Sequence, residues 1–457
     1  MIGRANEGGG IRLRPGGWRR GAVVLTVVAM IAGCGSSDDD DSGGGEASSS
    51  GGGGGAAAVD FGDLEAVCGP GDASGATARG VTDSEIRITT MADPGNPFAP
   101  GLGQENFDAA EAFVQWCNDA GGILGRQIVL TTRDAMMTDV AAKVIEACAT
   151  DFMMVGSLSV LPEPGIEPRV GCGLGSIPAG TADPDESRSD LLVTPDAASD
   201  EYAAVGNFRA IQRAYPEAVQ HYGTMGVDIG PLGDARQAER EAAESIGYET
   251  VSDQALPETV DNFRPYVQQL ADDGVRALVP SALSQVIEQL IQAANDIGYA
   301  PEVMLLSATE YRAPLIEAAA AIEFPPTWTS TSGWPVDMAD ENPAMQDAIS
   351  IVEPVNPDLA RDNSIYALSS WVLWAVSAKA CGSDLTVECV IEEAGSQEAW
   401  TAGGLTAPKN LDPAENRPSE CVAMLRVTPE GFVYDEEMTV PNEGIFNCDP
   451  SNVVEIG

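Results

Sequence analysis

Histidine is almost absent from this sequence. His221 is the only imidazole in 457 residues, and it lies in the middle of a predicted strand. Serine and cysteine hydrolases need an imidazole base beside the nucleophile, and the sequence has no Gly-x-Ser-x-Gly elbow. It also has no Gly-x-x-x-x-Gly-Lys-Ser/Thr loop and no Gly-x-Gly-x-x-Gly after the first predicted strand. We therefore expect no enzyme and no cofactor, and a secreted hydrolase is the weakest of the alternatives.

The N-terminus lacks an apolar run long enough to cross a bilayer, which takes about 20 residues. Its apolar segment, residues 22–31, is short, follows five arginines within residues 1–20 and ends on Ile31-Ala32-Gly33-Cys34. A basic head, a short apolar core and small residues before a cleavage point are typical of a secretory signal peptide. A cysteine directly after them resembles the lipobox of bacterial lipoproteins, whose thiol receives a diacylglyceryl group. This predicts a lipid anchor on Cys34 at the outer face of the cell membrane, and an ordinary signal peptide remains the alternative.

Basic residues are scarce. The chain has 24 Lys and Arg against 70 Asp and Glu, with a formal net charge of −46. Only Lys143, Lys379 and Lys409 are lysines, and five of the arginines belong to the predicted signal peptide. Such a surface repels phosphate backbones and anionic lipid head groups, so we expect no nucleic-acid partner.

Setting Cys34 aside leaves eight of the nine cysteines, which is an even number. In a chain exported from the cytosol, this count predicts four disulfides. Zinc is the competing interpretation, but no Cys-x-x-Cys occurs and only one histidine is present, so no metal site is expected. Connectivity cannot be read from the sequence, and the expected pairs are Cys381–Cys389, Cys421–Cys448, Cys148–Cys172 and Cys68–Cys117.

Residues 35–59 are rich in glycine, serine and aspartate and have no apolar periodicity. They predict a disordered tether. Beyond them, β-rich runs alternate with amphipathic stretches of helical length, which indicates parallel sheets covered by helices on both faces. Expected strands are residues 85–89, 127–131, 152–155, 176–179, 191–194, 219–227, 248–255, 275–280 and 302–307. Expected helices are residues 105–119, 138–150, 201–214, 236–246, 262–273, 284–297 and 364–380.

The two series of strands and helices predict an α/β protein of two Rossmann-like lobes with parallel sheets, joined by a three-crossover hinge. After Phe324 the chain becomes proline-punctuated and then strongly helical, which indicates a return to the first lobe. The expected division is 1–33 signal peptide, 34–59 lipidated Cys34 and tether, 60–200 lobe one, 201–330 lobe two, 331–420 return to lobe one, and 421–457 crossing back to lobe two and tail.

One block of sequence carries a family resemblance. Residues 116–130 read Trp-Cys-Asn-Asp-Ala-Gly-Gly-Ile-Leu-Gly-Arg-Gln-Ile-Val-Leu: a helix end, a Gly-Gly stop, a tight turn and a buried strand. This order is similar to Asn-x-x-Gly-Gly-Ile-x-Gly-Arg/Lys-x-Ile in the branched-chain amino-acid (leucine/isoleucine/valine) binding proteins of ABC transporters. The resemblance extends through residues 155–159 (Val-Gly-Ser-Leu-Ser) and 177–181 (Ile-Pro-Ala-Gly-Thr), and it covers roughly residues 80–435.

The resemblance implies the type I periplasmic-binding fold and a ligand site between the lobes. Strand ends in open α/β sheets present backbone N–H groups and helix N-termini to a crevice. By resemblance, Ser157 or Ser159, with Ala179 and Thr181, would hold the α-carboxylate and α-amino group of an amino acid. The alternative, that these hydroxyls only cap helix N-termini and bind no ligand, remains open.

In lobe two the sequence departs from the family pattern, so the resemblance does not indicate which side chain the ligand carries. Glu310 is a candidate partner for an ammonium, Tyr311 a candidate for stacking, and Phe98 a candidate lid in a long, proline-rich first loop. Trp371 and Trp374 are three residues apart in an apolar helix, which favours core packing over ligand contact.

The sequence as a whole predicts an extracytoplasmic solute-binding lipoprotein of an ABC uptake system. Its expected partners are an amino acid or similar small solute, a permease, and the membrane through the lipid anchor. A ligand-binding sensor subunit that partners a membrane receptor is the alternative.

Overall fold

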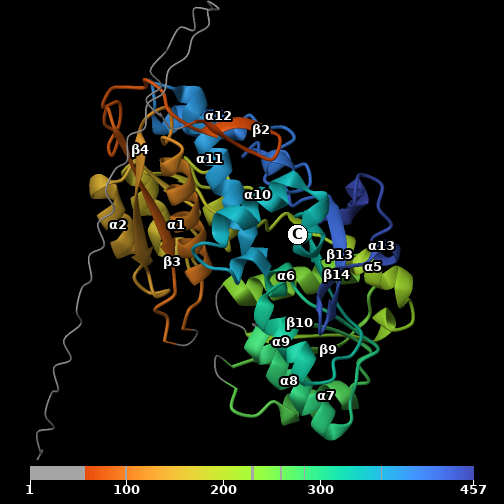
Figure 1. Ribbon diagram of the computed structural model, residues 1–457. Coiled ribbons are helices and arrows are strands. Elements are labelled where there is room, and N and C mark those ends of the chain that lie inside the picture. The colour runs from red at the N-terminus through yellow and green to blue at the C-terminus, as the bar shows by residue number, and fades with distance from the viewer. Residues whose placement is uncertain are drawn as a thin grey trace, which may run out of the picture. The chain divides into compact units, whose positions relative to one another are not determined.

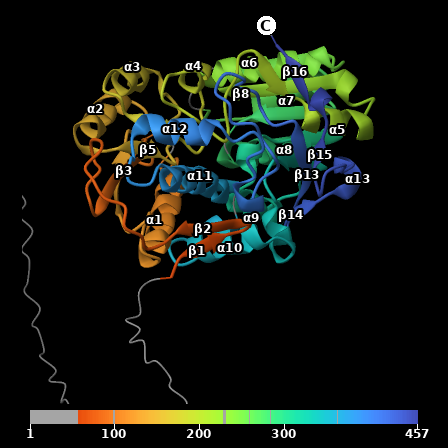
Figure 2. The same cartoon turned by 90° about the horizontal axis from the view of Figure 1, so that it is seen from above.

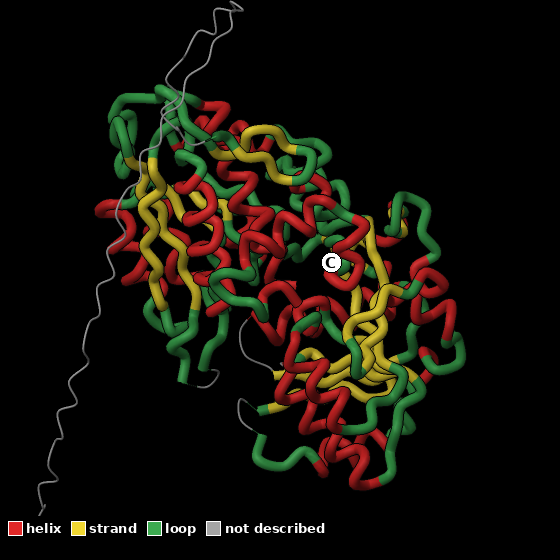
Figure 3. The backbone as a smooth tube through the Cα atoms, viewed as in Figure 1, coloured by secondary structure: helices red, strands yellow, loops and turns green. Residues whose placement is uncertain are grey.

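The computed structural model describes residues 57–97, 100–227, 231–257, 260–282, 284–361 and 363–456. The predicted signal peptide, Cys34, nearly all of the predicted tether and Phe98 lie outside these residues. Among the helices that are described, none combines the length and the apolar composition needed to span a bilayer. The strands gather in two groups, each surrounded by helices (Figure 3).

The first sheet has four parallel strands. Ile86 and Ile88 are fully buried on one of its faces, while Arg87, Thr89 and Met91 point to the other, as the two-residue period of a strand requires. Both faces are covered, which is the usual situation of parallel sheets. The order across the sheet is β4 (Gln127–Asp134), β3 (Glu85–Ala92), β5 (Met153–Val155) and β6 (Gly175–Ile177).

Helices from two distant parts of the chain surround this sheet and form lobe one with it (Figure 1). The first group is α1 (Gln104–Asp119), α2 (Val140–Thr150), α3 (Glu163–Gly171) and the short α4 (Pro184–Ser187). The second group is α10 (Pro343–Val352), α11 (Ala367–Cys381) and α12 (Val387–Gly395). α1 packs against both α10 and α11. The hairpin of β1 (Val59–Phe61) and β2 (Leu64–Cys68) lies beside α10 (Figure 2).

The second sheet is larger and mixed, and with its helices it forms lobe two. Neighbouring strands from β9 to β12 are parallel, whereas β13 is antiparallel to β12, β14 and β15. Its order is β14 (Gly431–Tyr434), β13 (Cys421–Thr428), β12 (Thr327–Thr331), β11 (Val303–Leu305), β10 (Ala277–Ser281), β8 (Tyr222–Val227) and β9 (Thr250–Leu256), with β15 (Asn447–Cys448) beside β13.

Residues of β10 alternate between two cores. Leu278 faces the cluster built with α7 (Arg264–Asp272), α8 (Ser284–Ile297) and α9 (Ala313–Ala321). Ala277 and Val279 face the cluster built with α5 (Gly206–Ala214) and α6 (Pro231–Ser245). The remaining elements of lobe two are α13 (Glu436–Thr439) and the separate pair of β7 (Tyr202–Ala204) and β16 (Val453–Glu455).

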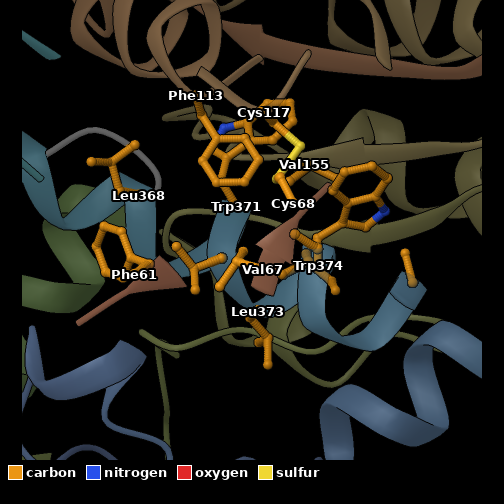
Figure 4. Packing of buried hydrophobic residues seen from close by; sticks show 14 of the residues in the cluster. Phe61, Val67, Cys68, Phe113, Cys117, Val155, Leu368, Trp371, Leu373 and Trp374 are labelled. Carbon is orange, nitrogen blue, oxygen red and sulfur yellow. A yellow bond between two sulfur atoms is a disulfide. The ribbon is translucent and has the colours of Figure 1, made fainter. Parts of the chain in front are cut away.

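The core of lobe one centres on α11. Every residue from Ala367 to Ala375 is buried, and a helix that is apolar on all sides belongs in a core. Trp371 and Trp374 are both fully buried, which confirms the prediction that they pack in the core. Their rings meet edge to face, and Trp371 also contacts Phe113 (Figure 4).

Four disulfides join the eight described cysteines, in the same pairs that the sequence suggests. Cys68–Cys117 fastens the N-terminal hairpin to α1, and Cys148–Cys172 links α2 to the residue after α3. Cys381–Cys389 links α11 to α12, and Cys421–Cys448 links β13 to β15.

Three local predictions are wrong. Residues 191–194 form no strand, because only Leu192 makes an isolated bridge, to Ser176. Residues 202–204, expected to begin a helix, instead pair as β7 with the distant β16. His221 ends a 3-10 turn before β8 and is exposed, rather than lying in mid-strand.

Candidate functional site

Ser157 lies at the carboxyl ends of the strands of lobe one. Its Oγ accepts a hydrogen bond from the backbone N–H of Met91 at 3.0 Å, and its carbonyl accepts from the N–H of Ala179 at 3.0 Å. Gly156, just before it, has φ +66°, a conformation that glycine adopts without strain. Ser157 therefore joins the ends of β3, β5 and β6, the edge at which open α/β sheets bind ligands.

Ser159 belongs to a cluster centred on Asp93, which is 1% exposed. Asp93 Oδ2 accepts from the hydroxyl of Ser159 at 3.1 Å and from the N–H of Val160 at 3.0 Å. Asp93 Oδ1 accepts from the N–H of Met137 at 2.7 Å. One carboxylate thus ties together the loops that follow β3, β4 and β5. The sequence prediction missed this role, although an aspartate directly after a strand and before a Pro-Gly turn was a visible signal.

Thr181 connects the loop after β6 to the segment that leads into lobe two. Its N–H donates to the carbonyl of Asp196 at 3.0 Å, and its Oγ1 accepts from the N–H of Ala198 at 2.9 Å. Its hydroxyl also pairs with that of Ser187 in α4 at 2.5 Å. Ala179, two residues earlier, is partly buried on the same loop. The four lobe-one residues predicted to bind ligand therefore share one edge of the sheet.

Glu186, next to Ser187, is a partly buried acid. Burial raises the pKa of Glu186 to about 8, and the nearby Arg169 guanidinium opposes that rise. Arg169 itself donates to the carbonyl of Leu174, just before β6, and to three partners within residues 189–191. A buried arginine thus fastens the segment after α4 to the residue before β6.

Glu310 and Tyr311 follow β11 in lobe two and are both buried. Glu310 is 2% exposed and ends a short 3-10 turn that Ser307 caps. The Tyr311 hydroxyl accepts from the N–H of Val336 at 2.8 Å, and its ring packs on Phe432 with centroids 4.5 Å apart. The Tyr311 ring therefore lies in the lobe-two core.

A second cluster of polar side chains lies at the carboxyl ends of β8 and β10. The Ser281 hydroxyl donates to Glu239 of α6 at 2.9 Å, and burial raises the pKa of Glu239 against that hydrogen bond. Arg236, one turn earlier in α6, is ion-paired with Asp253 of β9. Its Cδ would lie 2.9 Å from a Cβ at Gly226, so the helix start approaches the strand end closely.

An ion pair between described residues joins the two lobes. Arg312, directly before α9, lies 2.8 Å from Glu105 in the first turn of α1. The Arg312 Nε also donates to the carbonyl of Thr309 at 2.8 Å, which fixes the side chain against its own loop. This pair shows that the loop after β11 faces the loop after β3, so the carboxyl ends of both sheets point at each other. The sequence prediction missed both residues.

Neither of two small cavities in the described part of the chain is lined by a residue predicted to bind ligand. A cavity of about 10 Å³ is apolar and lies between α7, α8 and β10. A cavity of about 20 Å³ lies between residues 187–197 and 409–417. Each has room for a water molecule but not for an amino acid. Ser157 and Ser159 are only 4% and 5% exposed, so a solute can reach them only if the residues around them move.

The part of the chain that is described holds no group of three or more His, Cys, Asp or Glu side chains placed to bind a metal. Lys409 beside the second cavity is instead hydrogen-bonded to the carbonyl of Pro195 at 2.7 Å, and burial lowers the pKa of its ammonium. The Trp328 indole N–H donates to Asp435, and its ring packs edge to face on Tyr215. Trp328 is therefore a core residue of lobe two.

Comparison with known proteins agrees with this arrangement. The model of the periplasmic binding protein family matches residues 218–431. The chain has the type I periplasmic-binding fold. No curated protein sequence matches it significantly. The matching family is one of binding proteins rather than catalysts.

Several solved structures of this fold are similar to the chain. A fatty acid ABC transporter substrate-binding protein from Thermomonospora curvata has 20% identity and a TM-score of 0.66, covering 84% of this chain and 95% of its own. The branched-chain amino acid binding protein LivJ from Streptococcus pneumoniae, in complex with isoleucine, has 13% identity and a TM-score of 0.63, covering 77% and 99%. A solute-binding protein from R. palustris, in complex with 4-hydroxybenzoate, has 14% identity and a TM-score of 0.61, covering 80% and 98%.

Arg312→Ala is expected to shift this periplasmic-binding fold toward an arrangement with the lobes apart. The variant removes the guanidinium of lobe two that pairs with Glu105 of lobe one. A partly exposed ion pair contributes about 0.5–1 kcal/mol, so the population should shift roughly two- to five-fold. Small-angle X-ray scattering of the ligand-free protein measures the shift as a larger radius of gyration. Arg264→Ala is the matched control, because its pair with Asp296 lies within lobe two. Identical scattering from the two variants would contradict the prediction.

Proposed function

We propose that this chain is an extracytoplasmic solute-binding lipoprotein of an ABC uptake system. Residues 60–200 and 331–420 would act as lobe one, and residues 201–330 and 421–457 as lobe two. A small solute would bind to one lobe, and closure of the other would complete its contacts. The closed form would then dock on a permease, held near it by a lipid on Cys34 and the tether of residues 34–59.

The observation that carries this proposal is the Glu105–Arg312 pair, which lies between the loops that follow β3 and β11. Hinged proteins bind solutes between facing loops of this kind. The loop after β3 is joined to Ser157 and Ser159, and the loop after β11 contains Glu310. The proposed site is therefore lined from both lobes, with hydroxyls on one side and a carboxylate on the other.

The three similar structures point to the class of solute. Their names give a fatty acid, isoleucine and 4-hydroxybenzoate, and all three carry a carboxylic acid group. We propose that the ligand of this chain is an amino acid or a related small carboxylate. The hydroxyls of Ser157 and Thr181, together with backbone N–H groups at the strand ends, would hold its carboxylate.

Thr181→Ala is expected to weaken solute binding about ten-fold, since a hydrogen bond to a charged group contributes roughly 1.5–3 kcal/mol. A panel of amino acids, amides and small carboxylic acids is titrated into the full chain, and tryptophan fluorescence is recorded. The wild type should show a saturable change with at least one of them. Thr428→Ala is the matched control, because its hydroxyl is bonded within the β13–β14 turn of lobe two, beside the start of β12. No response to any compound would refute the proposed function.

A further inference from the structure

A polar crevice lies between two segments that lead from lobe one into lobe two. Its volume is about 20 Å³, and the residues that line it belong to the segments 187–197 and 409–417. The first segment continues into β7 and the second into β13. A group bound in the crevice therefore contacts two of the connections between the lobes at once. None of the residues predicted to bind solute lines it.

Lys409, which lines the crevice, has an ammonium that is removed from water. Its Nζ donates to the carbonyl of Pro195 at 2.7 Å, and no described carboxylate forms an ion pair with it. A lysine ammonium has three N–H donors, so two remain for another acceptor. Burial lowers the pKa of this ammonium, and the more distant charge of Asp196 opposes the effect. A positive charge in such a place is stabilised by an anion that contacts it.

Other side chains of the crevice also offer N–H groups. Asn416 Nδ2 uses one of its protons on a backbone carbonyl at 3.4 Å. Asn410 Oδ1 accepts from the N–H of Asp412 at 3.0 Å, and the amide nitrogen of Asn410 donates to no described residue. Arg417 lies over the ring of Tyr202, with its Cζ 4.6 Å from the ring centroid. The N–H groups of Arg417 likewise have no described acceptor.

The acceptors at the crevice are mostly engaged within their own segments. Asp412 is the carboxylate that lines the crevice, but it is exposed, and its Oδ1 accepts from the N–H of Ala414 at 2.9 Å. Thr194 Oγ1 accepts from the N–H of Asp196 at 3.1 Å and donates to the carbonyl of that residue at 3.0 Å. The Ser187 hydroxyl pairs with another hydroxyl at 2.5 Å. The described lining thus has more free donors than free acceptors.

From these contacts we infer that the crevice is a binding site for a small monovalent anion such as chloride. The anion accepts from the Lys409 ammonium and from the side-chain amides of Asn410 and Asn416, and Arg417 adds positive charge at the exposed side. A volume of about 20 Å³ admits a single ion and excludes an amino acid. The bound ion ties together the segments before β7 and β13. This site is separate from the proposed solute site and does not depend on it.

Bromide is the probe for this site, because it resembles chloride and is located by its anomalous scattering. Crystals of the protein soaked in sodium bromide should show an anomalous peak in hydrogen-bond contact with Lys409 Nζ. In solution, replacing gluconate by chloride at constant ionic strength should raise the unfolding temperature of the full chain by about 1–3 °C. Mass action requires this of a ligand that binds only the folded state.

Lys409→Met keeps most of the aliphatic stem and removes the ammonium, so it should abolish both the bromide peak and the effect of chloride. Lys143→Met is the matched control. It removes the same charge from a lysine of α2 that pairs with Glu146, and it should keep both signals. Arg417→Gln changes an exposed side chain and tests the site even if Lys409→Met does not fold. It should weaken the affinity for chloride about two- to five-fold.

The inference is overturned if bromide gives no peak and the crevice holds a water molecule only. It is also overturned if the wild type unfolds at the same temperature in chloride and in gluconate. Loss of the chloride effect in Lys143→Met as well as in Lys409→Met would also overturn it, because general screening of an acidic protein would then be the cause. The proposed function is judged separately, by the panel of solutes.

Discussion

Gly156→Ala is expected to lower the free energy of unfolding of the protein by about 2–5 kcal/mol. The residue has φ +66°, where a non-glycine residue costs roughly 1–2 kcal/mol. A Cβ at this position would lie 2.3 Å from Nε1 of Trp371, a fully buried ring that Phe113 and Trp374 hold in place. Forcing extra volume into such a core adds about 1–3 kcal/mol. Chemical denaturation followed by tryptophan fluorescence measures the loss.

Gly173→Ala separates the two causes of this loss. Gly173 is in the same lobe and has φ +69°, but a Cβ there would meet nothing within 4 Å. Only the backbone term should appear, so the variant should lose about 1–2 kcal/mol. Equal losses in the two variants would mean that Trp371 yields without cost. Gly156→Ala should also weaken solute binding, because the displaced turn carries Ser157 directly after it.

The sequence predicts the elements that are set by local periodicity. The expected strand at residues 85–89 is the start of β3, and the expected helix at 284–297 is α8 as observed. Buried apolar runs and helical spacing of apolar residues need only neighbouring residues to be recognised.

The failures are elements whose conformation is decided by distant partners. β7 at Tyr202–Ala204 lies before α5 and reads as helix, but it pairs with β16 at Val453–Glu455. The sequence did not predict the β1–β2 hairpin, which is held on lobe one by the disulfide of Cys68 and by packing of Phe61. Tertiary contacts of this kind override local preference.

The features of the candidate site also fall into two groups, those that local sequence patterns predict and those that depend on distant contacts. Ser157, Ser159, Ala179 and Thr181 follow strands that the periodicity locates, so their common edge can be predicted. The proton of Ser159 cannot be assigned from the sequence, because its direction depends on Asp93, 66 residues earlier. The Glu105–Arg312 pair depends on how two lobes meet, which no local pattern contains.

Removing the Cys68–Cys117 disulfide is expected to cost about 4 kcal/mol of stability. The bond closes a segment of 49 residues between the N-terminal hairpin and α1, beside Trp371 and Phe113 (Figure 4). Cross-linking a longer loop removes more freedom from the unfolded chain, and the chain-entropy estimate for this loop is about 4 kcal/mol. The Cys68→Ala/Cys117→Ala double variant should therefore unfold at a markedly lower denaturant concentration.

Cys381→Ala/Cys389→Ala is the matched double variant within the same lobe. Its disulfide closes only eight residues, for which the same estimate is about 2.5 kcal/mol. Cys68 and Cys117 are also buried, so part of their loss comes from the two small spaces that alanine leaves. Denaturing the wild type with and without reductant removes the cross-links without deleting any sulfur. If the two double variants lose equal stability, loop closure is not what makes the Cys68–Cys117 bond important. A larger loss at Cys68–Cys117 would mean that the hairpin preceding the first sheet stabilises the lobe that carries the serine loop.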